Sequence, residues 1–226
     1  MTTKAPRTER RTDALSKGKI VETAIQILDE GGEGALTFRA LATRLATGAG
    51  AIYWHVADKN ELLAAAADDV VAGVMAQVGD DAGDPKATIR TIALGVFDAI
   101  DAHPWVGAQL FREPWRAATV QIFEGVGGRL EALGVPDAGL FDAASAIVFY
   151  VLGVAGQNAA NARLAREAGR TDRGAFLASV AARWDQLDPA QHPFVRKVAS
   201  RMRDHDDRQQ FLAGVDLFLA GIEARG

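Results

Sequence analysis

The stretch Leu36–Leu63, LTFRALATRLATGAGAIYWHVADKNELL, constrains the fold of this chain more than any other. Thr37 stands where a helix N-cap is expected, because its hydroxyl can accept a backbone N–H of the first turn. Apolar residues follow at helical spacing, namely Leu41, Ala42 and Leu45. Thr47-Gly48 then predicts a turn, with Thr47 as a second candidate cap, and residues 49–56 predict another helix. Two short helices joined by a turn that contains Gly are typical of a helix-turn-helix motif.

A further helix is needed to complete the core of this unit, since helices of two turns are marginal on their own. Residues 18–28 place four apolar side chains on one face before a predicted stop at Gly31-Gly32: Ile20, Ala24, Ile27 and Leu28. Asp58–Val78 is predicted as one uninterrupted helix capped by its first residue. Ile52 and Val56 lie four residues apart and are expected to face the core of the unit.

These residues resemble the pattern of a known family. The pattern consists of Leu36-Thr37, Arg39, Leu41-Ala42, Leu45 and the run Ile52-Tyr53-Trp54-His55-Val56, followed by Lys59, Leu62 and Leu63. It resembles the DNA-binding domain of TetR-family repressors, and the Tyr-Trp-His-Val run is similar to that of the tetracycline repressors. The resemblance covers roughly residues 17–67 and implies a DNA-binding domain followed by a helical body.

In that family the second helix of the pair enters the major groove of DNA. The resemblance therefore implies a set of DNA-lining residues on this helix: Ala49, Gly50, Ala51, Tyr53 and His55. Ala51 can contact a thymine methyl, while Tyr53 and His55 can hydrogen-bond to phosphates. Packing in the protein core is the alternative for the aromatic side chains of Tyr53 and Trp54.

Three residues outside this helix are also expected to contact DNA. Thr37 can donate to a phosphate, and Lys59 is expected to clamp one. Arg39 is the candidate for bidentate contact with a guanine edge, a contact that discriminates by ~1–3 kcal/mol. Residues 48–51, GAGA, lack the hydrogen-bonding side chains that are frequent in the family. This departure shifts sequence readout toward Arg39, the N-terminal arm and DNA shape.

Charge and composition are compatible with this interpretation. The net charge is −4, but six basic and two acidic residues lie within the first 19 residues. Arg7, Arg10 and Arg11 are expected to reach phosphates or the minor groove, with a solvated tail as the alternative. The chain has no cysteine and no apolar leader, and its longest apolar run, 143–156, is too short for a bilayer. We expect a cytoplasmic protein without membrane contact.

No β-type alternation and no internal repeat is present, so the chain is predicted to be all-α. We divide it into a flexible basic arm at 1–16, a helix-turn-helix domain at 17–63 and a helical effector-binding and dimerisation domain at 64–226. Gly and Pro residues bound most of the helices predicted in the last domain, which are 85–103, 115–133, 139–168 and 171–187, with a short piece at 105–111 between Pro104 and Pro114. A helical turn or two is predicted over 194–202, and the acidic run 204–207 leads into a last helix over 208–224.

A single DNA-binding domain makes few contacts, and a two-fold dimer places two of them ~34 Å apart on one face of DNA. The long helix over 139–168 carries small residues that permit close approach, and the last helix carries an apolar stripe. The predicted dimer interface comprises Gly153, Gly156, Ala160, Phe211, Val215, Phe218 and Ile222. Burial of both helices inside one subunit is the alternative.

The helical body also carries many aromatic residues and a cluster of amides, which are typical of a small-molecule pocket. The candidate effector-binding residues are Phe97, His103, Trp105, Phe111, Trp115, Phe123, Phe149, Tyr150, Gln157, Asn158 and Asn161. Arg112 and Glu113 stand beside the Pro breaks, where a segment could gate such a pocket. For each aromatic residue, core packing is the alternative.

A metal-dependent enzyme and a helical adaptor are the competing interpretations. Asp98-x-x-Asp101-x-His103 does not converge on one point, and Asp204-His205-Asp206-Asp207 is typical of a solvated acidic turn. An adaptor would leave the candidate DNA contacts without a shared role. We therefore expect a homodimeric transcriptional regulator that a small hydrophobic effector releases from a palindromic operator, with repression favoured over activation and with no enzymatic activity, cofactor or metal.

Overall fold

The computed structural model describes residues 15–78, 83–112, 115–167, 169, 172–203 and 205–224. The regular elements in these residues are all helices, which confirms the predicted all-α class. The chain divides into two compact units, one ending at Ala66 and the other beginning at Ala67. We call them the N-terminal unit and the C-terminal unit and describe each by itself. The predicted arm and its three arginines fall outside the described residues.

The N-terminal unit consists of α1 (Lys17–Ala35), α2 (Phe38–Arg44), α3 (Ala49–Tyr53) and the first turns of α4 (Lys59–Val78). Ser16 caps α1 by accepting from the Lys19 N–H. The predicted break falls at Gly32, whose φ of 68° is in the left-handed region, and one more turn follows before α1 ends. The core is formed by side chains from all four helices: Ile20, Ala24, Leu28, Leu41, Ile52, Val56, Leu62 and Leu63.

Two predicted helix starts are confirmed. The Thr37 hydroxyl accepts from the Ala40 N–H at 3.0 Å, and the Asp58 carboxylate accepts from the Glu61 N–H at 2.8 Å. Two details were wrong. Gly48, not Thr47, occupies the N-cap position of α3, with no side-chain cap bond. The helix ends at Tyr53 instead of residue 56, because the chain tightens into a turn there and the His55 N–H bonds to the Ile52 carbonyl.

In the described part of the C-terminal unit, the remainder of α4 is followed by seven α-helices and one 3₁₀ turn. Their bounds are α5 (Pro85–Ala102), α6 (Pro104–Arg112), α7 (Ala117–Ala132), α8 (Asp137–Glu167), α9 (Arg173–Asp185), α10 (Pro193–Val198), η1 (Ala199–Met202) and α11 (Asp207–Glu223). Proline opens three of these helices, where its missing N–H costs no hydrogen bond.

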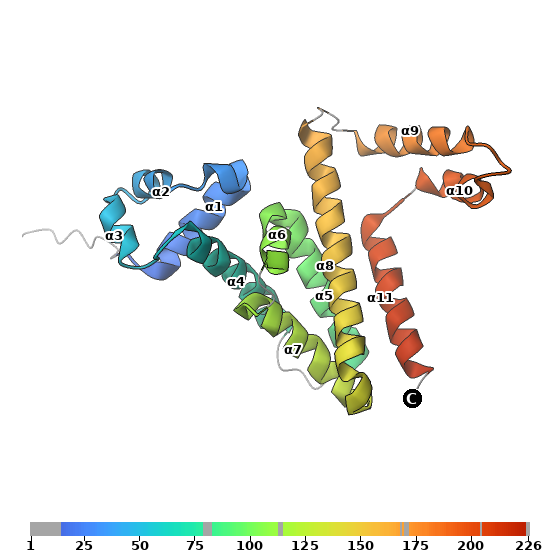
Figure 1. The fold of residues 1–226 in the computed structure, drawn as a ribbon, viewed down its shortest axis with the longest axis horizontal. Coiled ribbons are helices and arrows are strands. Elements are labelled where there is room, and N and C mark those ends of the chain that lie inside the picture. Colours follow the sequence, from blue (N-terminus) through green and yellow to red (C-terminus); the bar gives the residue numbers. More distant parts are fainter. Residues whose placement is uncertain are drawn as a thin grey trace, which may run out of the picture. The chain divides into compact units, whose positions relative to one another are not determined.

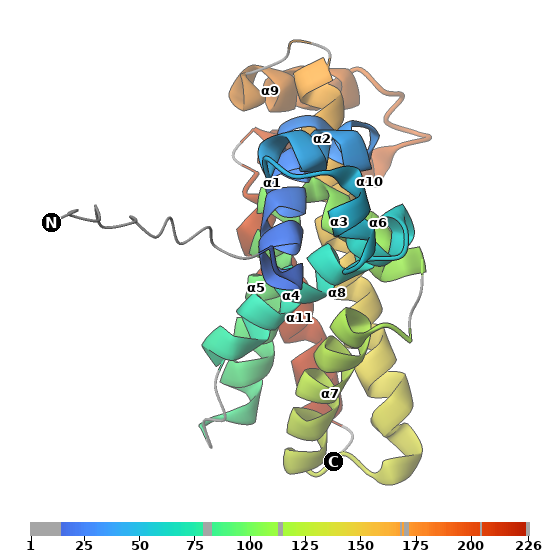
Figure 2. The same cartoon turned by 90° about the vertical axis from the view of Figure 1, so that its left-hand side faces the viewer.

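The long helix α8 organises the C-terminal unit. It packs against α5, α6, α7 and α11, and the ribbon shows α5 and α11 beside it (Figure 1) and α7 beside it as well (Figure 2). By length and composition, the segment Asp137–Ala165 is the one described stretch apolar enough to cross a membrane, and 33% of its most apolar window is buried in the unit. The remaining apolar side of α8 therefore faces outward in the single subunit.

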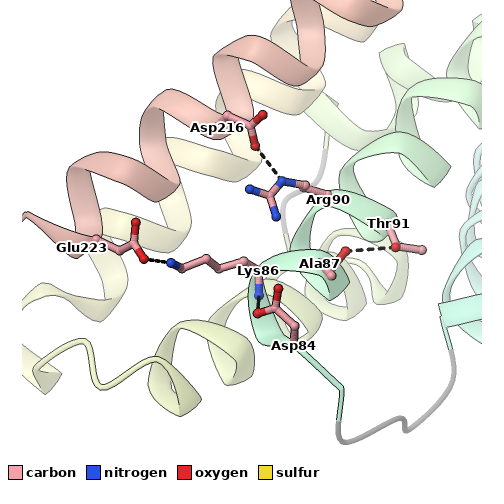
Figure 3. Close-up of polar contacts among 7 residues, drawn as sticks. All are labelled: Asp84, Lys86, Ala87, Arg90, Thr91, Asp216 and Glu223. Atoms are coloured by element: carbon pink, nitrogen blue, oxygen red, sulfur yellow. Dashed lines mark hydrogen bonds and ion pairs between the residues drawn. The ribbon is translucent and has the colours of Figure 1, made fainter.

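Helix α11 is fixed to α5 by ion pairs as well as by apolar packing. Lys86 pairs with Glu223, and the Arg90 Nε lies 2.6 Å from the Asp216 carboxylate (Figure 3). Near the other end of the pair, the Arg208 guanidinium lies 2.9 Å from Asp98. Exposed ion pairs each contribute only ~0–1 kcal/mol. Their main effect is therefore to fix the antiparallel register of α5 and α11.

Between these ion pairs, aromatic rings form the core contact of α11. The Phe211 ring stacks on Phe97 at a centroid distance of 4.6 Å and on Tyr150 at 5.8 Å. The Tyr150 hydroxyl donates to the Phe211 carbonyl at 3.2 Å, and burial raises the pKa of Tyr150. Phe211 and Val215 are completely buried within the subunit. Their prediction as dimer-interface residues was therefore wrong, because this face of α11 is already covered by α5 and α8.

Candidate DNA-binding surface and effector region

Arg39 lies on the exposed side of α2, next to the Thr37 cap. Among the described residues of the N-terminal unit, the other cations have partners. Lys17 pairs with Glu61 at 3.0 Å, Arg44 pairs with Glu30, Lys59 donates to the Glu33 carbonyl and Lys19 also has a contact. The Arg39 guanidinium has no hydrogen bond or ion pair within this described part of the chain. Its five donors therefore remain available for a guanine edge or phosphates.

The bidentate contact between Arg44 and Glu30 joins α2 to α1. The hydrogen bond from Arg44 lowers the pKa of the Glu30 carboxyl, and the same bond raises the pKa of Arg44. Both side chains are at the surface, so the pair positions helices more than it stabilises them. An engaged Arg44 also leaves Arg39 as the α2 cation that is directed to solvent.

Helix α3 presents a nearly bare surface. Ala49 and Gly50 are exposed and Ala51 is half-buried, while Ile52 is completely buried as predicted. A Cβ atom built on Gly48 or Gly50 would meet no atom within 4 Å. The outer side of α3 therefore offers backbone and methyl groups to a groove, and few side-chain donors.

An aromatic edge closes this surface. Tyr53 is 55% exposed and Trp54 is 89% exposed, so the interpretation of these two residues as core aromatics is wrong. The Tyr53 ring stacks face to face on Phe38, the first residue of α2, at 4.2 Å and an interplanar angle of 5°. The helical spacing of α2 does not single out Phe38 as a functional residue. Its position next to the Thr37 cap was the available signal, but the contact with α3 is tertiary.

His55 and Lys59 are less exposed to solvent than most of the predicted DNA-contacting residues on α2 and α3. His55 is half-buried in the turn after α3, and its backbone N–H bonds to the Ile52 carbonyl at 2.9 Å. The Lys59 ammonium donates to the Glu33 carbonyl, where it satisfies a backbone acceptor at the end of α1. Lys59 therefore joins α4 to α1 in this structure, and phosphate binding would have to use its remaining donors.

A hollow of about 390 Å³ opens elsewhere on the N-terminal unit. Its lining is mostly polar and comes from α1 and the end of α2: Lys19, Glu22, Thr23, Gln26, Arg44, Leu45 and Ala46. None of the predicted DNA contacts lines it. Its open, charged character differs from the enclosed apolar cavities that bind hydrophobic ligands.

The predicted effector residues divide into three groups by exposure. Phe97 and Trp105 are buried, and His103, Phe123, Tyr150 and Asn158 are half-buried. Phe111, Trp115 and Phe149 are 55%, 73% and 57% exposed, and Gln157 and Asn161 are exposed. Their ring contacts form two groups: Phe97 and Tyr150 pack on Phe211, whereas Phe123 and Phe149 meet edge to face at 6.1 Å.

Two of the polar candidates on α8 are joined by a hydrogen bond. The Gln157 amide donates to the Asn161 side-chain oxygen at 2.9 Å on the exposed side of the helix. His103 lies edge to face with Trp105 at 6.1 Å, at the break between α5 and α6. Glu113 lies outside the described residues. The exposed candidates on α8 itself are Phe149, Gln157 and Asn161.

A side chain of α4 caps the start of α7 in the C-terminal unit. The carboxylate of Asp68 on α4 accepts from the Ala118 N–H in the first turn of α7 at 2.8 Å. Helix α7 has no side-chain cap at its own N-cap residue, Arg116. The buried Thr119 hydroxyl donates to the Leu110 carbonyl of α6 at 3.4 Å. The start of α7 is therefore held from both α4 and α6.

The exposed sides of α8 and α11 carry several apolar residues. On α8 the exposed residues include Ala146, Phe149 and Gly153, whereas Gly156 and Ala160 are half-buried. On α11 the side chain of Leu217 is 75% exposed, while Phe218 and Ile222 are half-buried. Leu217 was missed because the sequence pattern was assigned to the Phe211 stripe, on the opposite side of the helix.

The acidic clusters considered as metal sites are engaged in other contacts. Asp98 binds Arg208, and Asp207 contacts both His205 and Arg173. Within the described residues, no group of three potential metal ligands is assembled. Asp204 lies outside them.

Comparison with known proteins covers nearly the whole chain. Residues 20–66 match the family described as "Bacterial regulatory proteins, tetR family", and residues 79–225 match "Tetracyclin repressor-like, C-terminal domain". An "HTH-type transcriptional regulator" of Saccharopolyspora erythraea is 32% identical over 156 residues, which are 66% of this chain and 63% of that protein. The repressor DrrR1 of Streptomyces coeruleorubidus is 27% identical, over 92% of this chain and 77% of its own length.

Solved structures share the fold of the entire chain. The transcriptional regulator SCO7222, a TetR from Streptomyces coelicolor, is 49% identical with a TM-score of 0.84, covering 93% of this chain and 98% of that one. ActR from the same organism, in complex with actinorhodin, is 24% identical with a TM-score of 0.78, covering 94% and 97%. The second similarity concerns the fold alone.

Proposed function

Since this chain belongs to the TetR family of bacterial transcriptional regulators, we propose that it is a homodimeric repressor released from a palindromic operator by a small hydrophobic effector. The observation that carries the proposal is Arg39 on α2, which is exposed and has no side-chain partner among the described residues, together with the bare surface of α3. A cation with free bidentate donors next to a slim helix suits a major groove. Its relatives are transcriptional regulators, and we propose no enzymatic activity.

Within the proposed operator complex, each residue has a distinct contribution. Arg39 reads a base edge, while Tyr53, and secondarily His55, bind phosphates. Ala49, Gly50 and Ala51 permit close approach of the α3 backbone. The Thr37 hydroxyl oxygen accepts the cap bond of α2, and its proton can still be donated to a phosphate. Because α3 has few donors, we expect part of the specificity to come from DNA shape.

The dimer is proposed to form through the open faces of α8 and α11. These faces carry Ala146, Gly153 and Leu217, which are apolar and exposed in one subunit. Pairing about a two-fold axis would cover them with the same residues of a second copy. In this arrangement the apolar character of α8, which by length and composition could cross a membrane, serves contact with the second subunit.

The proposed effector binds the C-terminal unit among the aromatic residues of α6, α7 and α8. The fold accommodates ligands, since ActR was solved with actinorhodin. Effector binding must favour a state in which the two DNA-binding units are wrongly spaced, and such coupling is typically ~1–3 kcal/mol. The Asp68 cap between α4 and α7 is the contact through which we expect a change at α7 to reach the connector.

The test is selection from a random DNA library at several salt concentrations, followed by sequencing of the bound fraction. We expect a palindrome and a steep salt dependence. Arg39→Ala should relax the selected sequence at one position in each half-site, with a cost of ~1–3 kcal/mol per contact. The matched control is Lys197→Ala on α10, an exposed cation of the C-terminal unit, which should change neither the sequence nor the affinity.

A library that yields no enriched sequence for the wild-type protein would refute DNA recognition. An enriched sequence that survives Arg39→Ala unchanged would leave the regulator standing and remove Arg39 from readout. An asymmetric selected site would contradict the dimeric arrangement.

A further inference from the structure

Helix α3 has little intrinsic rigidity. It is five residues long, contains Gly50 and begins at Gly48 without a side-chain cap. Such a helix is unstable in isolation, and each interior Gly costs ~1 kcal/mol relative to Ala. The turn before it includes Ala46 with φ of 49°, a strained value for a residue with a Cβ. The orientation of side chains on α3 must therefore come from contacts with other elements.

On its inner side, α3 is held by Ile52, which is completely buried in the core of the N-terminal unit. On the outer side, the aromatic contact is the parallel stack of Tyr53 on Phe38 at 4.2 Å. Phe38 is well placed to act as a platform, because the cap bond from the Ala40 N–H to Thr37 fixes the first turn of α2. The stack thus connects the end of the short helix α3 to the capped start of α2.

Tyr53 itself remains 55% exposed after stacking. Within the described residues, its hydroxyl has no hydrogen-bond partner in the protein. A tyrosine with a covered ring face and an open hydroxyl has one end fixed and the other available to a ligand. Fixing the ring before binding also removes part of the side-chain ordering cost on association.

We propose that Phe38 is a positioning residue for DNA binding, whose ring holds the Tyr53 hydroxyl in the orientation that donates to an operator phosphate. The inference rests on the proposed function, because it requires that α3 faces DNA. Phe38 itself acts through Tyr53 and needs no contact with DNA. Phe38→Leu should weaken operator binding by about 3- to 10-fold per DNA-binding unit, the worth of an aromatic pair.

The first test is a double-mutant cycle on the selected operator with Phe38→Leu, Tyr53→Phe and the combined variant. If Phe38 acts by orienting the hydroxyl, Phe38→Leu costs little once Tyr53→Phe has removed that hydroxyl. The salt slope should stay unchanged, because neither side chain is a cation that releases counterions. Phe38→Tyr should retain the stack and bind the operator as the wild type does.

A structural effect on the whole unit would behave differently. It would lower the salt slope, reduce the thermal midpoint and cost as much in the Tyr53→Phe background as in the wild type. Phe38→Met is the second variant should Phe38→Leu fail to fold, because Met keeps the volume without the ring. Equal operator affinity of the wild type and a folded Leu or Met variant would overturn the proposal, and so would an additive cycle.

The second test reads the stack without DNA. The chain contains two tyrosines, so 3-fluorotyrosine labelling gives two fluorine resonances, and Tyr53→Phe assigns them. Phe38→Leu should shift the Tyr53 resonance and leave that of Tyr150 in place. An unmoved Tyr53 resonance would overturn the positioning role even if the operator is found. If Phe38→Leu does move the Tyr53 resonance but the wild-type protein selects no DNA sequence, the proposed function is refuted, and with it the role of the hydroxyl.

Discussion

At the scale of single residues, Ala46 adopts a backbone conformation that is unfavourable for a residue with a Cβ. Its φ of 49° is in the left-handed region, where a Cβ crowds the following carbonyl, and it is the one non-glycine residue with positive φ in the described ranges. The turn between α2 and α3 imposes this value. Nothing in the pattern Ala46-Thr47-Gly48 says which of the three residues must adopt it, so the sequence placed the turn but not its strained position.

Ala46→Gly is therefore expected to raise the free energy of unfolding. Removal of the Cβ relieves the strain, partly offset by the greater freedom of Gly in the unfolded chain, for a net gain of about 0.5–1 kcal/mol. Ala40→Gly, in the right-handed interior of α2, is the control and should lose about 1 kcal/mol. Urea denaturation of both variants tests this, and an equal loss in the two would contradict the strain argument.

Gly214 shows a second constraint that only the folded state reveals. A Cβ at this position would lie 1.8 Å from the Tyr150 hydroxyl oxygen and 2.2 Å from its Cζ. Helix propensity alone predicts that Ala would improve α11. The close approach reverses that expectation, because the Tyr150 ring is held against Phe211.

Gly214→Ala should accordingly destabilise the protein by about 1–3 kcal/mol, as overpacking of a core does. Gly128→Ala on α7 is the control, since no atom lies within 4 Å of its added Cβ, and it should be neutral or stabilising. Thermal unfolding distinguishes the two. A stable Gly214→Ala protein would show that Tyr150 can leave its stack easily.

At the scale of elements, the sequence predicted most helices and their boundaries. Prolines and capping residues explain this success, since Pro85, Pro104, Thr37 and Asp58 act within one turn of chain. The start of α7 is different. Its cap comes from Asp68, 50 residues earlier, and no local pattern encodes a partner at that separation.

Loss of this tertiary cap has a predictable cost. Asp68→Ala should lower the free energy of unfolding by about 1 kcal/mol, whereas Asp68→Asn keeps an acceptor and should lose less. Asp69→Ala, the exposed neighbour on α4, is the control and should be near neutral. Chemical denaturation gives the ranking, and equal values for Asp68→Ala and Asp69→Ala would show that the cap does not contribute. Measured with the operator, Asp68→Ala also tests whether the cap biases DNA affinity.

At the scale of the whole molecule, a single subunit leaves apolar side chains of α8 and α11 exposed to water. Leu217 is 75% exposed there, whereas Phe211 and Val215, on the opposite side of the same helix, are completely buried. Water contact with such a surface is unfavourable by roughly 25 cal/mol per Å². A second copy of the chain is the partner that the proposed dimer supplies.

Leu217→Glu should therefore shift the protein toward monomer. A two-fold axis brings the substituted position into the interface twice, so the dissociation constant should rise at least about 100-fold, or ~2.7 kcal/mol. Val120→Glu, on a 50% exposed site of α7, is the control and should sediment as the wild type does. Sedimentation equilibrium separates the two, and an intact Leu217→Glu dimer would place the interface elsewhere.

The sequence by itself determined the helical class, the helix-turn-helix with its Thr37 and Asp58 caps, and the inward direction of Ile52 and Val56. These follow from interactions over three or four residues, which a linear pattern contains. Only the tertiary structure decided that Phe211 faces Phe97 and Tyr150, that Leu217 faces outward, and that Phe38 supports Tyr53. Helical periodicity defines an apolar face, but which neighbour covers that face depends on contacts between residues far apart in the chain.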